Sequence, residues 1–201
     1  MDLCDQCKWG NEMSPKKATA ATKERAINTL PLIFNENCKV LILGTFPGKE
    51  SRKHGYYYCD KRNRFWDIIG KLFGGVPKNN WERRDYLLNK GIALWDVCAC
   101  CNIIGSRDDL IEVVVANPIC CLLNMMKEKG KGIAVFCNGG KAYAKYNEHI
   151  KPKCHVDAIK LLSTSGRNSN ADLEKDWQYI SDYINDKITL QQIMDNKNSN
   201  K

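Results

Sequence analysis

The sequence predicts an α/β fold in which helices cover both faces of a parallel sheet. Short apolar runs of strand length alternate with longer segments of helical periodicity, which is the pattern of a parallel sheet. The length of 201 residues and the apolar content of 43% suit one domain with a sizeable core. We expect that domain over residues 29–190, between a polar N-terminal extension (1–28) and a polar C-terminal tail (191–201).

Four apolar runs are typical of buried strands. They are Cys38–Leu43, which ends at Gly44, and then Ile92–Val97, Gly132–Cys137 and His155–Leu162. The carboxyl ends of parallel strands meet at one edge of a sheet, where open α/β folds bind their ligands. The segments that should converge there are Thr45-Phe46-Pro47, Asp96, Asn138 and Ser163-Thr164-Ser165.

Helices are predicted between and after these strands. Their expected ranges are Phe65–Phe73, Trp81–Asn89, Asp108–Ala116, Pro118–Met126 and a last one from about Ala171 to Asp186. Gly74-Gly75 ends the first of them, and Gly130 closes the fourth. Residues 1–28 have the composition of a tail or a loosely attached helix, and the chain after Ile193 should be frayed.

The loop after the first strand is the most informative segment. Gly44-Thr45-Phe46-Pro47-Gly48 is followed by three tyrosines, Tyr56 to Tyr58, and by Asn63-Arg64-Phe65-Trp66. Aromatic faces beside a neutral amide suit a pocket for a flat molecule with a polar edge, such as a base. Basic residues crowd the same loop, which favours a nucleic-acid strand whose backbone is held while a base is stacked: Lys49, Arg52, Lys53, His54, Lys61, Arg62 and Arg64. The alternative is a solvated charged loop.

The overall charge agrees with a polyanionic partner. The formal net charge is +8, and Lys and Arg contacts to phosphate supply most sequence-independent affinity for nucleic acid. No apolar run approaches the roughly 18 residues that span a bilayer, and the N-terminus lacks the features of a secretory signal. We therefore expect a cytoplasmic protein, or a nuclear one in a eukaryote, with no membrane association.

The chain contains 11 cysteines, which should be reduced inside a cell. Cys4 and Cys7 have the spacing of a metal knuckle, and Cys98 and Cys101 repeat it, so zinc or an iron–sulfur cluster is one interpretation. The two pairs are far apart in sequence and no histidine stands at ligand spacing. We therefore expect structural cysteines and no metal or other cofactor.

Five segments, taken together and in order, resemble the uracil-DNA glycosylase superfamily, and within it the branch of hypoxanthine-DNA (deoxyinosine) glycosylases. They are GTFPGKES (44–51), YYYCDKRNRFW (56–66), GIALWDVCACC (91–101), FCNGGKAY (136–143) and LLSTSGRNSN (161–170). The resemblance implies a three-layer α/β/α sandwich around a four-stranded parallel sheet. It also implies a monomeric enzyme without a cofactor that cleaves the N-glycosidic bond of a deaminated base in DNA, such as hypoxanthine, uracil or xanthine.

The resemblance also suggests a catalytic residue. Where relatives carry a water-activating Asn or Asp in the first motif, this sequence has Phe46, which can neither orient nor deprotonate water. The hypoxanthine branch uses an Asn of the following motif, and the matching residue is Asn63. Its carbonyl oxygen could orient a water, while the alternative is an Asn that caps the loop through the backbone.

Base recognition is expected from the strand ends. Asp96 stands where relatives have a base-reading Asn, and it could accept the N1–H of hypoxanthine; the alternative is a structural Asp that caps the next segment. Phe46 and Tyr57 or Tyr58 are the stacking candidates. Leu161 replaces the histidine that some members use to stabilise the departing base, so that role would pass to backbone N–H groups, Asn138 or Thr164.

The last motif is expected to meet the DNA backbone. Ser163 and Ser165 are candidates for phosphate binding, and Arg167 stands where a wedge would enter the base stack. The full set of expected DNA contacts is Lys49, Ser51, Arg62, Arg64, Ser163, Thr164, Ser165 and Arg167. Two other functions remain open: a non-catalytic nucleic-acid binder with this fold, and an iron–sulfur glycosylase that acts on uracil.

Overall fold

The structure is a computed structural model, and it describes residues 23–104, 107–166, 168 and 171–199. Its centre is a parallel sheet of four strands in the order β3-β2-β6-β7. The strands are β2 (Val40–Gly44), β3 (Ile92–Asp96), β6 (Ala134–Asn138) and β7 (Ala158–Leu161). All five residues of β2 are buried, as expected for a central strand covered on both faces. The four predicted strands are confirmed.

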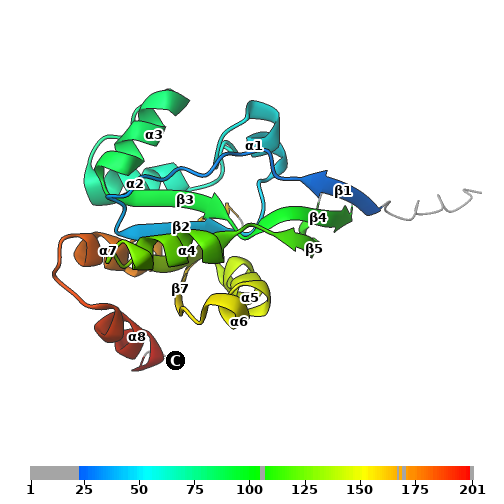
Figure 1. The fold of residues 1–201 in the computed structure, drawn as a ribbon. Helices are drawn as coiled ribbons and strands as arrows, with labels where there is room; N and C mark the ends of the chain where they lie inside the picture. Colours follow the sequence, from blue (N-terminus) through cyan, green and yellow to red (C-terminus); the bar gives the residue numbers. More distant parts are fainter. Residues whose placement is uncertain (1–22, 105–106, 167, 169–170, 200–201) are drawn as a thin grey trace, which may run out of the picture.

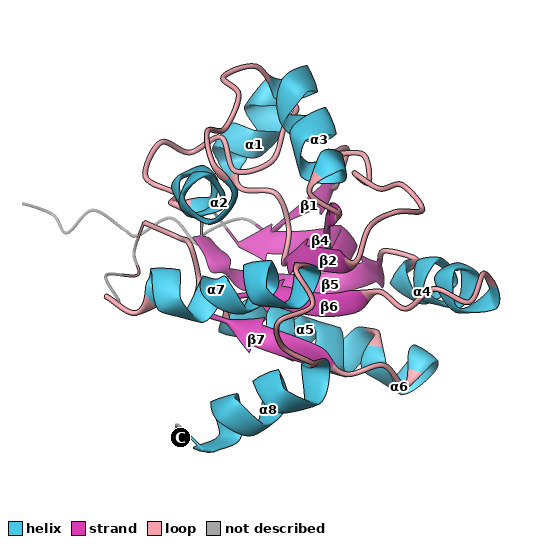
Figure 2. Ribbon diagram, turned by 90° about the vertical axis from the view of Figure 1, so that its left-hand side faces the viewer, coloured by secondary structure: helices cyan, strands magenta, loops and turns pink. Residues whose placement is uncertain are grey.

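Helices form the outer layers (Figure 2), and their contacts divide them into one group with α2 and α7 and another with α4, α5 and α6. Their bounds are α1 (Lys49–His54), α2 (Phe65–Phe73), α3 (Asn80–Asn89), α4 (Ile119–Glu128), α5 (Gly140–His149), α6 (Lys151–Cys154) and α7 (Leu173–Ile184). In the first group, α2 contacts α7, and the rings of Phe65 and Trp177 meet edge to face at 5.8 Å. In the second group, α6 contacts α4 and α5, while α5 packs on β6 and β7. The predicted α/β/α arrangement is confirmed.

A second sheet extends from the carboxyl edge of the first (Figure 1). It is antiparallel, in the order β1-β4-β5, and consists of β1 (Lys23–Ile27), β4 (Cys98–Ile104) and β5 (Arg107–Ala116). The helix predicted over Asp108–Ala116 is therefore wrong. Its run of β-branched residues, which includes Val113-Val114-Val115, pairs with β4, and such residues lose side-chain freedom in a helix. The described end of the N-terminal extension is likewise a strand instead of a tail or loose helix.

The C-terminal region also differs from the prediction. Residues expected to fray form most of α8 (Leu190–Ser199). A reciprocal cap begins this helix: the backbone N–H of Gln192 donates to Oγ1 of Thr189 at 3.3 Å, and the Thr189 N–H donates to Oε1 of Gln192 at 2.9 Å. Ile193 is fully buried and docks the helix on the domain. The domain limits at residues 28 and 190 stay predictions.

Candidate active site at the carboxyl ends of the parallel strands

Three of the parallel strands deliver polar groups to one place. The side-chain amide of Asn138, at the end of β6, donates one hydrogen bond to the hydroxyl of Tyr58 (3.0 Å) and one to Oγ1 of Thr164 (2.9 Å). Its oxygen accepts from the backbone N–H of Thr164 (2.9 Å). Tyr58 belongs to the segment that connects β2 to α2, in the loop after α1. Thr164 belongs to the loop after β7. The expected convergence of the strand ends is therefore present, with Asn138 at its centre.

Asp96, the last residue of β3, is a buried carboxyl group at this edge, with 3% of the residue exposed. Nδ2 of Asn28 donates to its Oδ2 at 3.2 Å, and Nδ2 of Asn117 donates to its backbone oxygen at 2.8 Å. Burial raises the pKa of Asp96 to about 7, and the hydrogen bond from Asn28 partly opposes this increase. Near neutral pH the carboxyl group is thus available as an acceptor and as a donor.

Gly44 makes room for that carboxyl group. A Cβ atom on Gly44 would lie 2.3 Å from Oδ1 of Asp96 and 3.2 Å from the hydroxyl oxygen of Tyr58. Both polar groups therefore lie directly over the end of β2, and any larger residue would displace them. This close approach places the ends of β2 and β3 and the tyrosine loop in one small polar cluster, which we call the Asp96 cluster: Gly44, Tyr58, Asp96, Asn138 and Thr164.

Tyr58 connects the Asp96 cluster to an open cleft. Its ring is stacked on Phe65 with centroids 4.1 Å apart, and its φ of 54° places its backbone in the left-handed region. Burial raises the pKa of the Tyr58 hydroxyl, and the nearby Asp96 carboxylate adds to the increase. The cleft has a volume of about 380 Å³ and is lined by His54, Tyr58, Cys59, Asp60, Lys61, Asn63, Trp66, Asp67, Asn80 and Arg83.

Asn63 lines this cleft from the segment before α2. Its Oδ1 accepts a hydrogen bond from the backbone N–H of Phe65 at 3.0 Å, so the capping role left open by the sequence is present. A carbonyl oxygen has two lone pairs, and the second can still accept a hydrogen bond from a water. The cleft therefore contains Asn63 and Tyr58, while Asp96 lies beyond Tyr58 and does not line it.

The loop before α2 and the loop after β7 are joined at the same edge. The backbone N–H of Arg64 donates to the oxygen of Thr164 (2.8 Å), and the Arg64 guanidinium donates to the oxygen of Asn168 (2.6 Å). A Cβ on Gly166 would lie 2.7 Å from both Cβ and the backbone oxygen of Arg62. Only glycine permits this contact between the two loops.

Comparison with known proteins decides the family. The model of the uracil DNA glycosylase superfamily matches residues 31–186. The chain belongs to the uracil DNA glycosylase superfamily. It is 29% identical over 140 residues to a hypoxanthine DNA glycosylase of Methanosarcina barkeri, a match that covers 69% of this chain and 85% of the relative. It is 27% identical over 154 residues to the protein of that name from Methanosarcina acetivorans, covering 75% and 94%.

The fold comparison agrees with this assignment. A solution NMR structure of a candidate uracil DNA glycosylase from Methanosarcina acetivorans superimposes with a TM-score of 0.66 and 26% sequence identity. The match covers 78% of this chain and 96% of the other. Membership of the superfamily makes this protein a DNA glycosylase, an enzyme of DNA repair whose substrate is DNA. No helix in the described part of the glycosylase is both long and apolar enough to cross a bilayer.

Of the three residues expected to stack on a base, only Tyr58 lines the cleft. Tyr58 lies at the cleft, whereas Tyr57 is 3% exposed and its hydroxyl donates to the backbone oxygen of Pro31 at 2.9 Å. Tyr57 is thus part of the core. Phe46 is 8% exposed, and the guanidinium of Arg52 covers its ring at 5.5 Å from the centroid. The guanidinium of Arg52 therefore occupies one face of the Phe46 ring.

The expected DNA contacts divide into exposed and buried groups. Lys49 and Arg62 are exposed, while Arg64, Ser163 and Ser165 are half-buried. Ser51 and Thr164 are buried at 6% and 0% exposure, and the hydroxyl oxygen of each accepts a hydrogen bond from within the protein. Both hydroxyl groups therefore hold loops in place within the protein, and their expected contacts with DNA stay predictions. Arg167, the expected wedge, lies outside the described residues.

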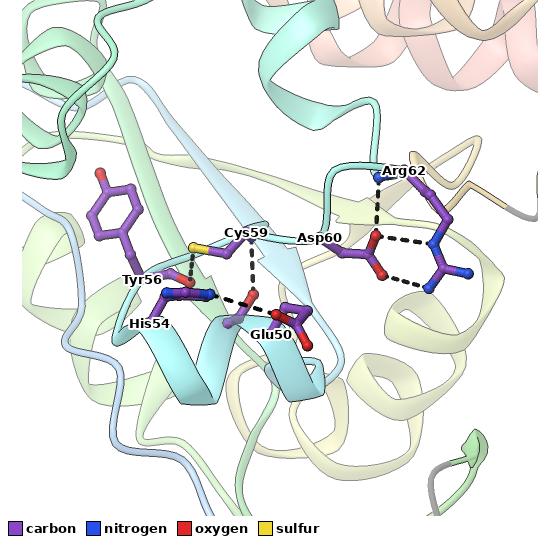
Figure 3. A network of polar contacts seen from close by, with 7 residues as sticks. Glu50, His54, Tyr56, Cys59, Asp60 and Arg62 are labelled. Atoms are coloured by element: carbon purple, nitrogen blue, oxygen red, sulfur yellow. Dashed lines mark hydrogen bonds and ion pairs between the residues drawn. The ribbon is translucent and has the colours of Figure 1, made fainter.

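The loop between α1 and α2 has its own polar network, drawn in Figure 3. The backbone N–H of Cys59 donates to Oγ of Ser51 at 3.2 Å, and the Cys59 thiol donates to the oxygen of Tyr56 at 3.2 Å. Asp60 binds the Arg62 guanidinium through both carboxylate oxygens, at 3.1 and 2.8 Å, and hydrogen bonds from Arg62 lower the pKa of Asp60 to about 2. The positive charge of Arg62 is therefore already partly balanced.

The cysteines of the described segments lie apart from the cleft, except for Cys59. Cys98 and Cys101, one of the two pairs with knuckle spacing, are buried in β4. Within the described part of the chain, no three histidine, cysteine or acidic side chains are grouped as metal ligands would be. Cys4 and Cys7 lie outside the described residues, so the N-terminal half of that interpretation is not addressed by the structure.

Sequence reasoning missed two asparagines that support Asp96. Asn28 is the last residue of the expected N-terminal extension. Its Nδ2 donates to Asp96, and its Oδ1 accepts from the N–H of Leu30 at 2.9 Å. Asn117 follows β5 and bonds the backbone at the end of β3. No local pattern marks either residue, because both depend on the antiparallel sheet that the sequence did not predict.

Proposed function

We propose that this glycosylase removes hypoxanthine from DNA that contains deoxyinosine, and that uracil and xanthine are weaker substrates. The observation that carries the proposal is the buried carboxyl group of Asp96, set over Gly44 at the carboxyl edge of the sheet. The names of the two Methanosarcina relatives support it. Active sites commonly hold titratable groups whose pKa is shifted by burial, as the pKa of Asp96 is.

Asp96 has the chemistry to read a deaminated base. Hypoxanthine presents an N1–H donor beside the O6 acceptor, whereas adenine presents an acceptor at N1. A carboxylate accepts the N1–H, and a protonated carboxyl group can also donate to O6. Both forms are accessible to Asp96 near pH 7. Uracil and xanthine carry the same neighbouring N–H and C=O groups, which is why they enter the proposal as further substrates.

Entry of a base requires the loop at 55–63 to move. Asp96 is almost fully buried, and the hydroxyl of Tyr58 lies over the same end of β2 as its Oδ1. Displacing Tyr58 would expose Oδ1 and release one N–H of Asn138, which now donates to the tyrosine. That N–H then becomes a donor for the departing base, the role of an oxyanion-hole group. The ring of Tyr58 remains available to stack on the base.

In this proposal Asn63 positions the water that reacts with the sugar. Asn63 lines the cleft, and in this proposal its carbonyl oxygen orients the water that adds to C1′ of the sugar as the bond from C1′ to the base nitrogen breaks. The electron pair of that bond leaves with the base, and a proton from the water follows. An amide is a weak base, but a cationic sugar needs little activation of its nucleophile. Phe46, in the first motif, contributes only apolar surface.

One excision assay tests the substrate. Oligonucleotides with a single deoxyinosine, deoxyuridine or deoxyxanthosine are incubated with the protein, and abasic sites are cleaved with alkali. We expect strand breaks at deoxyinosine first. Intact strands for all three substrates, with a folded protein, would reject the proposal and favour a non-catalytic DNA-binding member of the superfamily.

A matched pair of variants tests Asn63. Asn63→Ala should lower the excision rate about 100-fold while DNA binding is retained; this is the lower end of the range for a general base, because Asn63 orients the water without taking its proton. Asn80→Ala makes the same chemical change elsewhere in the same cleft and should leave the rate close to that of the parent. Loss of the hydrogen bond to Phe65 should cost Asn63→Ala about 1 kcal/mol of stability, so rates are compared below its melting temperature. An unchanged rate in Asn63→Ala would show that another group orients the water.

A further inference from the structure

Trp81 stands out as an aromatic side chain that the fold does not use. It lies in the first turn of α3 and is 81% exposed, the highest value among the large apolar side chains of the described residues. The other exposed side chains of this kind, Ile27, Val114 and Val115, are aliphatic and lie on the antiparallel sheet. A buried tryptophan usually removes 150–250 Å² from water, so leaving one in solvent forgoes a large stabilisation.

Trp81 does not line the cleft itself, but it stands in the chain between two residues that do. These two residues, Asn80 and Arg83, line the cleft together with Asn63 and Lys61. The chain direction explains why: α3 leads into β3, so the first turn of α3 lies toward the carboxyl edge of the sheet, where the site is. The exposed ring of Trp81 therefore belongs to the helical turn that borders the proposed binding cleft.

Hydrogen bonds and a cation–π contact hold the backbone of the first turn of α3, to which Trp81 belongs. The side chain of Asn79 accepts from the backbone N–H of Glu82 at 2.8 Å and caps the helix. Nε of Arg83 donates to the oxygen of Pro77 at 2.8 Å, and its guanidinium lies 4.7 Å from the ring centroid of Trp66. These contacts fix the backbone on both sides of Trp81.

The charge around Trp81 allows an anionic strand to pass beside it. Lys61 and Arg83 lie on the cleft wall, and Lys78 is exposed before the helix. Four acidic residues lie in the same region. Asp60 is paired with Arg62 and Asp85 with Arg84, so two of the negative charges are partly balanced. Glu82 is on the helix, and Asp67 lines the cleft. Cations beside an exposed ring are the two parts of a site for single-stranded nucleic acid.

We propose that Trp81 stacks on an unpaired base of the damaged strand, next to the nucleotide that enters the cleft. This inference rests on the proposed function, because it takes the cleft as the place of the reacting nucleotide. An indole ring needs an accessible base face, and in an intact duplex those faces are covered by the neighbouring pairs. The contact therefore favours single-stranded or distorted DNA over perfect duplex.

The experiment measures binding of undamaged DNA, so it does not depend on catalysis. A fluorescent single-stranded oligonucleotide and the matching duplex are titrated with the parent protein, Trp81→Ala, Trp81→Phe and Val115→Ala. Val115 is a control for loss of an exposed apolar side chain, because it is 49% exposed on β5. Trp81→Ala should weaken single-strand binding about tenfold, within the range for loss of one base–aromatic stack, and duplex binding less. Trp81→Phe and Val115→Ala should stay within about threefold of the parent.

Salt dependence and fluorescence separate stacking from charge. Trp81→Ala should leave the slope of log affinity against log salt unchanged, whereas Lys78→Ala should reduce it by about one contact. Single-stranded DNA should quench tryptophan emission in the parent more than in Trp81→Phe. Parental affinity in Trp81→Ala, or equal losses on single strand and duplex, would overturn the inference. If no deaminated base is excised but Trp81→Ala still loses single-strand binding, the proposed function fails, and only the stacking of Trp81 on single-stranded DNA is kept. Excision of deoxyinosine with no effect of Trp81→Ala on binding keeps the proposed function and overturns this inference.

Discussion

Replacement of Asp96 by Asn tests the physical state of the proposed base-reading group. Asn keeps the shape of the side chain and an oxygen that can accept the hydrogen bond from Asn28, but it cannot ionise. Burial raises the pKa of Asp96 from the ordinary value of 3.8 to about 7. The folded state therefore favours the protonated carboxyl group, and the unfolded state releases the proton at much lower pH.

The sign and size of the effect follow from this difference. The contribution of protonated Asp96 to the free energy of unfolding is fully present below pH 3.8 and is lost as pH rises to about 7. Each pH unit in that interval corresponds to about 1.4 kcal/mol, so the whole interval corresponds to about 4 kcal/mol. Between pH 5 and pH 8, where urea unfolding is practical, the expected loss is about 3 kcal/mol. Asp96→Asn should lack this loss.

The measurement is the difference between parent and variant in urea unfolding at several pH values from 5 to 8. Taking the difference removes every group that titrates alike in both proteins. Asp96→Asn should gain stability relative to the parent as pH rises, and the gain should level off above about pH 7. A difference that stays constant within about 0.5 kcal/mol would refute the argument, because it would mean that Asp96 ionises in the folded protein as it does in water.

Two further substitutions test the Asp96 cluster. Gly44→Ala would place a Cβ 2.3 Å from Oδ1 of Asp96, and we expect a loss of about 1–3 kcal/mol in urea unfolding together with loss of excision. A variant with parental stability and activity would mean that the carboxyl group need not lie over β2. Thr164→Val keeps the shape of a fully buried side chain but removes the oxygen that accepts from Asn138, so thermal unfolding should show a cost of roughly 1–3 kcal/mol. An unchanged melting temperature would show that this hydrogen bond contributes nothing net.

The parallel sheet could be predicted because its signals are local. Buried strands appear as short apolar runs, and α2 begins and ends at the predicted residues, Phe65 and Phe73, with Gly74 after it. The antiparallel sheet has no such signal. Cys98–Ile104 and Arg107–Ala116 become strands by pairing with each other, and Lys23–Ile27 becomes one by pairing with the first of them. Tertiary pairing of this kind overrides local propensity.

The site shows the same limit at the level of single side chains. The sequence places three tyrosines together but cannot say which one faces the cleft, since that depends on the backbone between them. The left-handed backbone of Tyr58 turns its ring onto Phe65 and its hydroxyl toward Asn138, while Tyr57 points into the core. Ser51, the last residue of the motif GTFPGKES, is an expected DNA contact, and the structure shows its hydroxyl oxygen accepting from the N–H of Cys59.

Hydrogen bonds connect the Asp96 cluster to the segment that contains Asn63. The Tyr58 hydroxyl is held by Asn138, and Asn138 holds Thr164 through two hydrogen bonds. Thr164 in turn accepts from the backbone N–H of Arg64, beside Asn63. Displacement of Tyr58 by a base, as we propose, would therefore disturb contacts that also hold the segment next to Asn63 and the loop after β7. Because these parts share hydrogen bonds, the entry of a base that we propose would be coupled to the position of Asn63, whose Oδ1 accepts from the N–H of Phe65.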